Sequence, residues 1–218
     1  MSEKYKILII GANGGIGRQS VEIALAAGHL VTAVLRQPAN LALTHPNLEI
    51  IQGDVMHPET FEKKIGPQDA VISALGVKGG VMGDKPTTLY SQGNANLLRL
   101  MKEKGIRRAY FISASAIEIS PVMPFFARFA AKYILQKLLR HMYADQREME
   151  RLVKISGLDW TIIRPPRLTD KPVTGKYRFS INSFLKNCLS VSRADVAHFM
   201  IYNISNKDII QATIEIGY

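Results

Sequence analysis

The stretch KILIIGANGGIG, residues 6–17, decides the fold, because an apolar run leads directly into three glycines at a spacing of three. Four consecutive apolar residues, 7–10, are typical of a strand that is buried on both faces of a parallel sheet. Gly11 permits a tight turn, Gly14 allows the backbone to approach a pyrophosphate, and Gly17 allows a helix to pack closely on the sheet. The following helix would offer unpaired N–H groups to phosphates. The predicted loop that binds a dinucleotide consists of Gly11, Asn13, Gly14, Gly15, Ile16 and Gly17.

Five further apolar runs follow, with helix-length segments between them. The runs are residues 30–35, 48–51, 70–74, 109–112 and 160–163, and the segments 18–27, 91–104 and 142–156 end at Gly28, Gly105 and Gly157. A glycine after the last helical residue is the expected left-handed stop. The alternation predicts an α/β fold, a Rossmann-like doubly wound parallel sheet of about six to seven strands with a small C-terminal substrate region. We expect one NAD(P)-binding domain over residues 1–218.

Two regions interrupt this alternation. Residues 76–90 are rich in glycine and follow the fourth strand, and residues 165–195 contain three prolines and follow the sixth. Ligands bind outside the carboxyl ends of strands in open α/β sheets. We therefore expect both regions, the first as a mobile loop, to form walls of a substrate site together with residues 121–143.

The end of the second strand indicates which dinucleotide is bound. NAD sites usually place an acid there for the ribose 2′-hydroxyl, and NADP sites place a cation for the 2′-phosphate. Here the strand ends at Arg36, and no Asp or Glu occurs before Glu49. NADP(H) is favoured over NAD(H), with Arg18 as a second cation, although Arg36 could also be an ordinary surface residue.

The turns after the third and fourth strands supply further candidate cofactor contacts, namely Asp54, Val55, Leu75 and Gly76. Asp54 is placed to accept a hydrogen bond from the adenine amino group. It could instead, or in addition, cap a helix beginning near Pro58.

Composition and charge limit the classes of protein. The 218 residues are 47% hydrophobic with one cysteine, which excludes collagenous, disordered and disulfide-scaffold classes. Residues 1–98 hold eight basic and eight acidic side chains and residues 99–218 hold twenty and ten, so the net charge of +10 belongs to the second half. This asymmetry predicts anionic substrates or partners. The five histidines show no metal-ligand spacing, and no segment reads as a leader or a membrane span, so we expect a cytoplasmic protein without a metal.

Several stretches carry a family resemblance. They are GANGGIG, GHLVTAVLR, GDV, AVISALG, FISASA, SGLDWTIIRPPRLTDKPVTGKY and SRADVAHFM. Together they resemble atypical short-chain dehydrogenases/reductases with an NAD(P)H-binding, NmrA-like domain, especially the biliverdin IXβ reductase/flavin reductase group. The resemblance implies NADPH at the glycine loop, with Ser113 and Pro165 near the nicotinamide, and an open pocket for flavins or linear tetrapyrroles.

Typical members of that superfamily use a Tyr-x-x-x-Lys pair as acid and base. Tyr133 and Lys137 have this spacing, but the register implied by the resemblance places the pair at Met142 and Gln146. We therefore interpret Tyr133 and Lys137 as a coincidence within a helix, and we expect hydride transfer without such a pair.

The remaining catalytic candidates are Ser113, Ser115 and Arg167. Either hydroxyl could hydrogen-bond the nicotinamide amide or the substrate. Arg167 stands where the resembling group has a histidine; an arginine stays protonated and would clamp a carboxylate or phosphate, so protons would come from solvent. Two alternatives stay open: a non-catalytic NmrA-like redox sensor, and a carbonyl reductase or epimerase that does use Tyr133 and Lys137.

Residues 124–142 form a basic, amphipathic helix candidate. It could cap the active site or form a dimer face, which is the favoured interpretation, or lie on a membrane surface; contact with nucleic acid is the least favoured. The protein would be a monomer or a homodimer. Elsewhere, Trp160 is expected in the core, and Asp195 is expected to cap the helix that runs to Ile201.

Overall fold

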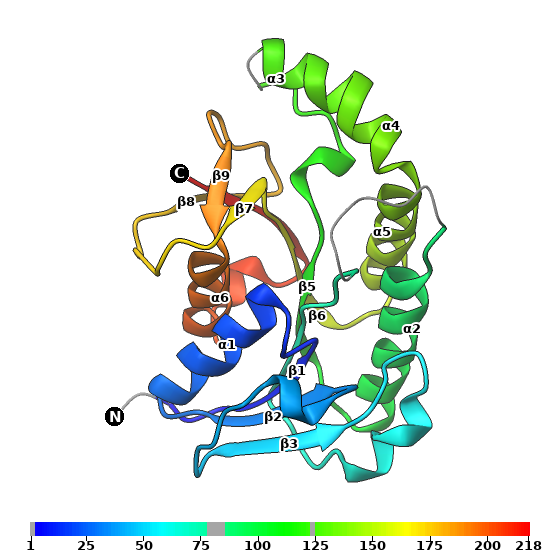
Figure 1. Ribbon diagram of the computed structural model, residues 1–218, viewed down its shortest axis with the longest axis vertical. Coiled ribbons are helices and arrows are strands. Elements are labelled where there is room, and N and C mark those ends of the chain that lie inside the picture. The colour runs from blue at the N-terminus through cyan, green and yellow to red at the C-terminus, as the bar shows by residue number, and fades with distance from the viewer. Residues whose placement is uncertain (1–2, 78–85, 123–124) are drawn as a thin grey trace.

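The computed structural model describes residues 3–77, 86–122 and 125–218, and a central sheet of eight strands dominates it (Figure 1). In spatial order the strands are β3 (Leu48–Gln52), β2 (Leu30–Leu35), β1 (Lys6–Ile10), β4 (Ala70–Ser73), β5 (Arg108–Ile112), β6 (Asp159–Arg164), β10 (Ala212–Gly217) and β8 (Arg178–Ile181). Every neighbouring pair is parallel except β10 and β8. A separate two-stranded sheet joins β7 (Arg167–Thr169) to β9 (Ser190–Ser192).

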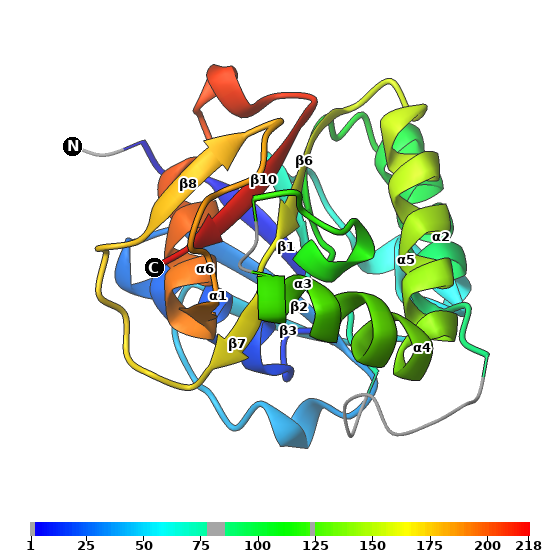
Figure 2. The ribbon, with the colours of Figure 1, turned by 90° about the horizontal axis from the view of Figure 1, so that it is seen from above.

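Helices cover both faces of the central sheet. On one face α1 (Gly15–Ala26) packs against α6 (Arg193–Tyr202), and on the other α2 (Leu89–Glu103) packs against α5 (Arg140–Lys154), as Figures 1 and 2 show. Successive side chains of β1 alternate between the two cores: Ile7 and Ile9 lie in the core beneath α1, and Leu8 and Ile10 lie in the core beneath α2. Burial on both faces explains why this strand is a continuous apolar run.

The six predicted strands are confirmed, and the sheet gains two more from the C-terminal region. β10 has the sequence ATIEIG, is mostly buried and lies between β6 and β8. β8 is an edge strand with the sequence RFSI, whose Phe179 and Ile181 side chains stay partly exposed. A four-residue strand with one open face carries too little apolar patterning to be recognised in the sequence. The predicted glycine stops are also confirmed, since Gly28, Gly105 and Gly157 all have positive φ.

Local structure differs from the sequence expectations around two aspartates. Ser192, not Asp195, caps α6, because the Ser192 hydroxyl accepts a hydrogen bond from the Asp195 N–H. The carboxylate of Asp195 instead accepts from the N–H groups of Thr174 and Gly175 and so fixes the 165–195 region. Asp54 caps no helix near Pro58; its carboxylate accepts from the Met56 N–H, and only a short 3-10 turn follows.

The expected helix over residues 124–142 is broken into pieces. It consists of α3 (Phe125–Ala130), a π-helical turn (Ala131–Leu135) and α4 (Gln136–Leu138), and α5 begins at Arg140. The expected loop 76–90 is described only at its ends, with residues 78–85 outside the described part, and α2 begins inside it at Leu89. None of the described helices is long and apolar enough to cross a membrane.

The chain order reverses at β1, which lies between β2 and β4. Such a switch point opens a crevice at the carboxyl ends of the strands, where ligands bind in folds of this kind. The glycine loop 11–17 leaves β1 at this point: residues 11–14 connect β1 to α1, and residues 15–17 are the first of α1 (Figure 1).

Candidate functional site

The glycine loop makes a turn that side chains would prevent. Gly11 has φ +78°, and a Cβ atom there would lie 2.5 Å from the carbonyl oxygen of Ala74 at the end of β4. The Gly14 N–H donates to the Gly11 carbonyl at 2.9 Å, which closes the turn. A Cβ atom on Gly17 would overlap that same carbonyl oxygen. The loop therefore holds the start of α1 tightly against the end of β1.

Neither the N-cap residue nor the first turn of α1 carries a group that would neutralise the N-terminus of this helix. Gly14 is the N-cap and supplies no side-chain cap, and the first turn of α1 carries no acidic residue. Asn13, Gly14 and Gly15 are exposed, and Ile16 and Gly17 are buried. An exposed helix N-terminus with free N–H groups favours an anionic ligand.

Arg193, the first residue of α6, lies directly over this loop. A Cβ atom on Gly15 would overlap the Arg193 Cδ and would lie 2.7 Å from its Nε. The guanidinium Nη1 pairs with Asp170 Oδ1 at 2.6 Å, and the Arg193 side chain is about one-third exposed. Sequence reasoning missed Arg193, because only the packing of α6 against α1 brings residues 15 and 193 together.

The other predicted cofactor residues lie at the same edge of the sheet. Arg36 directly follows β2 and is exposed, and Gly53, after β3, donates its N–H to the Leu35 carbonyl, so Asp54 lies close to the end of β2. Arg18 pairs with Glu22 at 2.9 Å along α1. Val55 is buried, Leu75 is half-buried and Gly76 is exposed. Because β3, β2, β1 and β4 are parallel, the residues that follow their carboxyl ends lie around the crevice beside the glycine loop.

The catalytic candidates lie around the ends of β5 and β6. Ser113 and Ser115 are both buried. The Ser113 hydroxyl donates to Glu150 Oε1 at 2.7 Å, and the Ser115 N–H donates to the carbonyl of the buried Pro165 at 3.0 Å. Arg167, in β7, is exposed. The structure therefore brings Ser113, Ser115 and Pro165 together but engages the Ser113 proton with a carboxylate.

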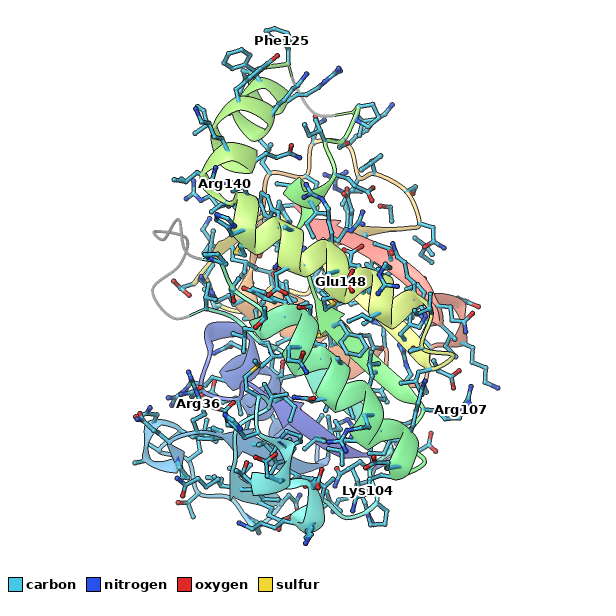
Figure 3. The ribbon with its side chains drawn as sticks, turned by 90° about the vertical axis from the view of Figure 1, so that its right-hand side faces the viewer. Arg36, Lys104, Arg107, Phe125, Arg140 and Glu148 are labelled. Atoms are coloured by element: carbon cyan, nitrogen blue, oxygen red, sulfur yellow. The ribbon has the colours of Figure 1, made fainter. Side chains whose placement is uncertain are left out.

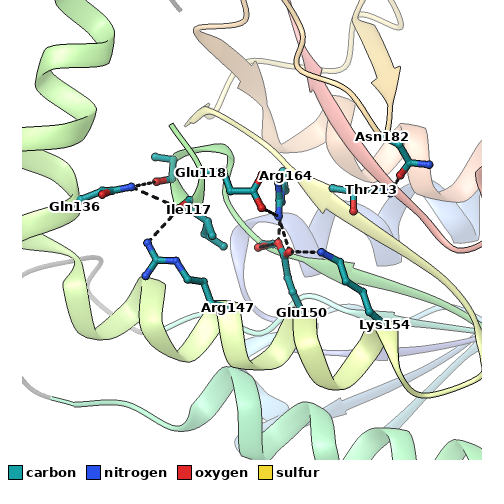
Figure 4. Close-up of polar contacts among 11 residues, drawn as sticks. Ile117, Glu118, Gln136, Arg147, Glu150, Lys154, Arg164, Asn182 and Thr213 are labelled. Carbon is teal, nitrogen blue, oxygen red and sulfur yellow. Dashed lines mark hydrogen bonds and ion pairs between the residues drawn. The ribbon is translucent and has the colours of Figure 1, made fainter. Parts of the chain in front are cut away.

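That carboxylate belongs to an ionic cluster whose central pair, Glu150 and Arg164, is buried (Figure 4). Arg164 donates to both oxygens of Glu150, at 2.8 and 2.6 Å, and to Glu118 at 2.9 Å, while Lys154 pairs with Glu150 at 3.3 Å. Burial alone would raise the pKa of Glu150, but hydrogen bonds and charge from Arg164, with the hydrogen bond from Ser113, hold it below its ordinary value. The cluster ties α5 to the end of β6 with its charges balanced.

The Tyr-x-x-x-Lys spacing does not mark a buried pair. Tyr133 lies in the π-helical turn with an exposed ring, and Lys137 is exposed in α4. At the register inferred from the resemblance, Met142 is half-buried and Gln146 is buried on α5. The Gln146 Oε1 has no hydrogen-bond partner within the described parts of the chain.

Comparison with known proteins decides the family. A family described as NAD(P)H-binding matches residues 11–207, from the first glycine of the loop to the turn before β10. The chain belongs to this NAD(P)H-binding family. NAD(P)H is the ligand of this family. Binding of a dinucleotide explains why a glycine loop lies at the switch point of the sheet.

Curated relatives of this NAD(P)H-binding chain are distant. A chloroplastic protein of Arabidopsis thaliana is 26% identical over 175 residues, which are 78% of this chain and 61% of that protein. An uncharacterised sugar epimerase of Bacillus subtilis is 27% identical over 206 residues, 93% of this chain and 89% of that protein. The chain thus spans less than two-thirds of the plant protein's length.

Solved structures share the fold of this NAD(P)H-binding chain. A short-chain dehydrogenase/reductase from Veillonella parvula in complex with NADP has a TM-score of 0.80 at 19% identity, covering 99% of this chain and 95% of that one. A candidate NADH-flavin reductase from Streptococcus pneumoniae has a TM-score of 0.75 at 23% identity, with coverages of 97% and 98%. At these identities the likeness establishes the Rossmann-like fold alone.

Proposed function

We propose that the protein is an NADPH-dependent oxidoreductase that reduces a flavin or another anionic, conjugated acceptor without a Tyr–Lys pair. The observation that carries this proposal is the glycine loop at the switch point, with an uncapped helix N-terminus and Arg36 at the end of the neighbouring strand. Residues 1–218 would act as one dinucleotide-binding unit. Segments 76–90, 121–143 and 165–195 would form the acceptor side.

The residues at the carboxyl edge fit a dinucleotide. Side chains at Gly11, Gly15 and Gly17 would overlap other atoms of the chain, so these glycines keep the turn and the start of α1 close together, where the N–H groups of the loop would bind the pyrophosphate. Arg36 would pair with the 2′-phosphate, and Asp54 would accept from the adenine amino group. Ser113 and Pro165 would lie beside the nicotinamide. When bound, NADPH supplies the hydride.

On the acceptor side the protein would mainly bind and orient. Ser113 has committed its proton to Glu150, so its oxygen is left to accept a hydrogen bond, as from a nicotinamide amide. The Ser115 hydroxyl would position the acceptor. Arg167 is exposed and permanently charged, which suits it to hold a carboxylate or phosphate of the acceptor rather than to deliver a proton.

The test is direct. Calorimetry with NADPH and NADP, followed by NADPH oxidation with FMN, riboflavin or biliverdin, should show both binding and accelerated turnover. Absence of binding overturns the proposal. Binding without turnover, together with cofactor-dependent capture of a partner, would instead establish a redox sensor. Unchanged activity in Tyr133→Phe would eliminate the Tyr–Lys alternative.

Replacing Arg36 tests the choice of dinucleotide. We expect Arg36→Ala to raise the Kd for NADP about tenfold to a hundredfold and to leave the Kd for NAD unchanged, because a hydrogen bond to a charged group contributes about 1.5–3 kcal/mol. Isothermal titration with both dinucleotides measures this. Lys63→Ala removes an exposed cation outside the crevice and should change neither Kd. Equal weakening of both dinucleotides would contradict the assignment to the 2′-phosphate.

Replacing Arg193 tests a contact with the pyrophosphate. We expect Arg193→Met to raise the Kd for NADP and for NAD by the same factor, about tenfold or more, because the two dinucleotides share the pyrophosphate. Asp170→Asn removes the carboxylate that competes for the guanidinium and should leave both affinities equal or higher. Unchanged affinities in Arg193→Met would show that the arginine only packs on Gly15.

A further inference from the structure

Residues 125–140, here called the arm, combine aromatic and basic side chains without any acid. Between Glu118 and Asp145 the sequence has no Asp or Glu, and the arm contains Arg128, Lys132, Lys137 and Arg140. Half of the large apolar side chains that the structure describes as exposed lie within it: Phe125, Phe126, Phe129, Tyr133, Ile134 and Leu138. So many exposed apolar residues in a single short segment indicate a binding surface.

The two kinds of side chain form adjacent rows. Phe125, Phe129 and Tyr133 follow one another at a spacing of four, and the Phe129 and Tyr133 rings lie 4.7 Å apart. Arg128 and Lys132 stand one position earlier at the same spacing, and Lys132 Nζ lies 5.2 Å from the Tyr133 ring centre. Side chains four apart lie on the same side of a helix. The arm therefore presents an aromatic row bordered by cations.

The fold holds the base of the arm and leaves its tip uncovered. Leu139 is buried with Ile117 and Tyr143, and Gln136 Nε2 donates to the Ala116 carbonyl at 3.4 Å. Beyond this anchor Phe125 is 85% exposed and Phe126 is 70% exposed. Figures 1 and 3 place α3 and Phe125 at one end of the long axis, away from Arg36 and β3. Phe125, at the tip of the arm, thus lies away from Arg36.

The charge of the arm indicates what covers it. A second copy of this chain would bring the same row of cations and the same total charge of +10 against the first. An anionic lipid surface complements both rows, because phenylalanine and tyrosine enter the boundary between headgroups and acyl chains while lysine and arginine meet the headgroups. We propose that the arm binds the surface of anionic membranes, with the Phe125–Tyr133 row inserted and Arg128 and Lys132 on the headgroups.

Vesicle flotation of the full chain tests this proposal, with or without dinucleotide. We expect at least about tenfold stronger partitioning to vesicles of equal parts phosphatidylcholine and phosphatidylglycerol than to phosphatidylcholine alone. Raising the salt from about 0.1 M to about 0.5 M should weaken binding to the anionic vesicles, because salt screens the charges.

Two combined variants separate the rows. We expect F125S/F126S/F129S and R128Q/K132Q each to weaken binding to anionic vesicles about tenfold or more. The matched controls are I155S/Y202S, which removes exposed apolar side chains elsewhere, and K63Q/K64Q, which removes two exposed cations elsewhere. Both controls should bind within about twofold of the wild type. Because all the replaced side chains are exposed, thermal unfolding should stay unchanged and confirm that the variants are folded.

Three results would overturn the proposal. The first is equal binding to the two kinds of vesicle, and the second is undiminished binding by F125S/F126S/F129S. The third is failure to bind either vesicle; if the wild type then self-associates in sedimentation and this variant does not, the arm is an interface between copies of the chain. Since the readout involves no turnover, it is independent of the proposed reductase activity.

Discussion

Glu150→Gln should lower the free energy of unfolding by about 3 kcal/mol, the lower end of the usual cost of breaking a buried ion pair, because Arg164 keeps a second anion. The side chains of Glu150 and Arg164 are only 4% and 7% exposed, and the carboxylate accepts two hydrogen bonds from the guanidinium. Glutamine keeps the size of the side chain but removes the charge, so Arg164 would stay buried with Glu118 as its remaining anion. Urea denaturation at neutral pH measures the loss.

The pH dependence of this loss has a defined sign. The folded-state pKa of Glu150 lies below its ordinary value, so its ionisation stabilises the fold above the unfolded pKa of about 4.3. This contribution is lost as the pH falls through the folded pKa, and the difference between wild type and Glu150→Gln should shrink in acid. Glu148→Gln is the control on the same helix, because Glu148 pairs with Arg151 in the open. Equal stability of the two variants at neutral pH would contradict the prediction.

Gly17→Ala should abolish measurable NADP(H) binding, with a Kd raised at least about a hundredfold. The new methyl group would overlap the Gly11 carbonyl oxygen, so the start of α1 would have to move away from the turn. The N–H groups of the loop would then no longer converge on a pyrophosphate. Losing two hydrogen bonds to a charged group costs about 3–6 kcal/mol, which is about a hundredfold in affinity or more.

Calorimetric titration with NADPH measures the effect, and Gly66→Ala is the matched control. A Cβ atom at Gly66 meets nothing within 4 Å, and Gly66 lies in the turn before β4. The affinity of the Gly66→Ala variant for NADPH should equal that of the wild type. Thermal unfolding of Gly17→Ala separates loss of the loop from loss of the fold. Undiminished binding by folded Gly17→Ala would contradict the placement of the pyrophosphate on this loop.

Local patterns were enough to predict most of the fold. Residues 6–17 carry their information within one strand and one turn, and each of the six predicted strands contains a short apolar run that is visible without its neighbours. This holds even for the edge strand β3, in which only Ile51 is buried. β8 was not visible, because its four residues, RFSI, contain no continuous apolar run. The break in the helix over residues 124–142 was also missed, since the sequence there lacks proline and glycine after Pro124.

The candidate site was predictable only where it is local. The glycines lie within one strand–turn–helix unit, and Arg36 directly follows the next strand. A short stretch of sequence therefore shows all of them. Arg193 reaches Gly15 across 178 positions, and Glu150 reaches Ser113 across 37, through helix packing that no short pattern encodes. For the same reason the sequence did not reveal that a buried carboxylate accepts the Ser113 proton.

The position of Arg193 has a thermodynamic consequence. Its guanidinium pairs with Asp170, in the segment after β7, while its stem lies on the glycine loop. An anion bound on the loop would compete with Asp170 for the Arg193 guanidinium. An acceptor that moves the 165–195 segment would change the strength of the Arg193–Asp170 ion pair. The two ligands would then alter each other's dissociation constants by one common factor, whichever binds first. A single arginine can in this way couple the affinity for the cofactor to the affinity for the acceptor.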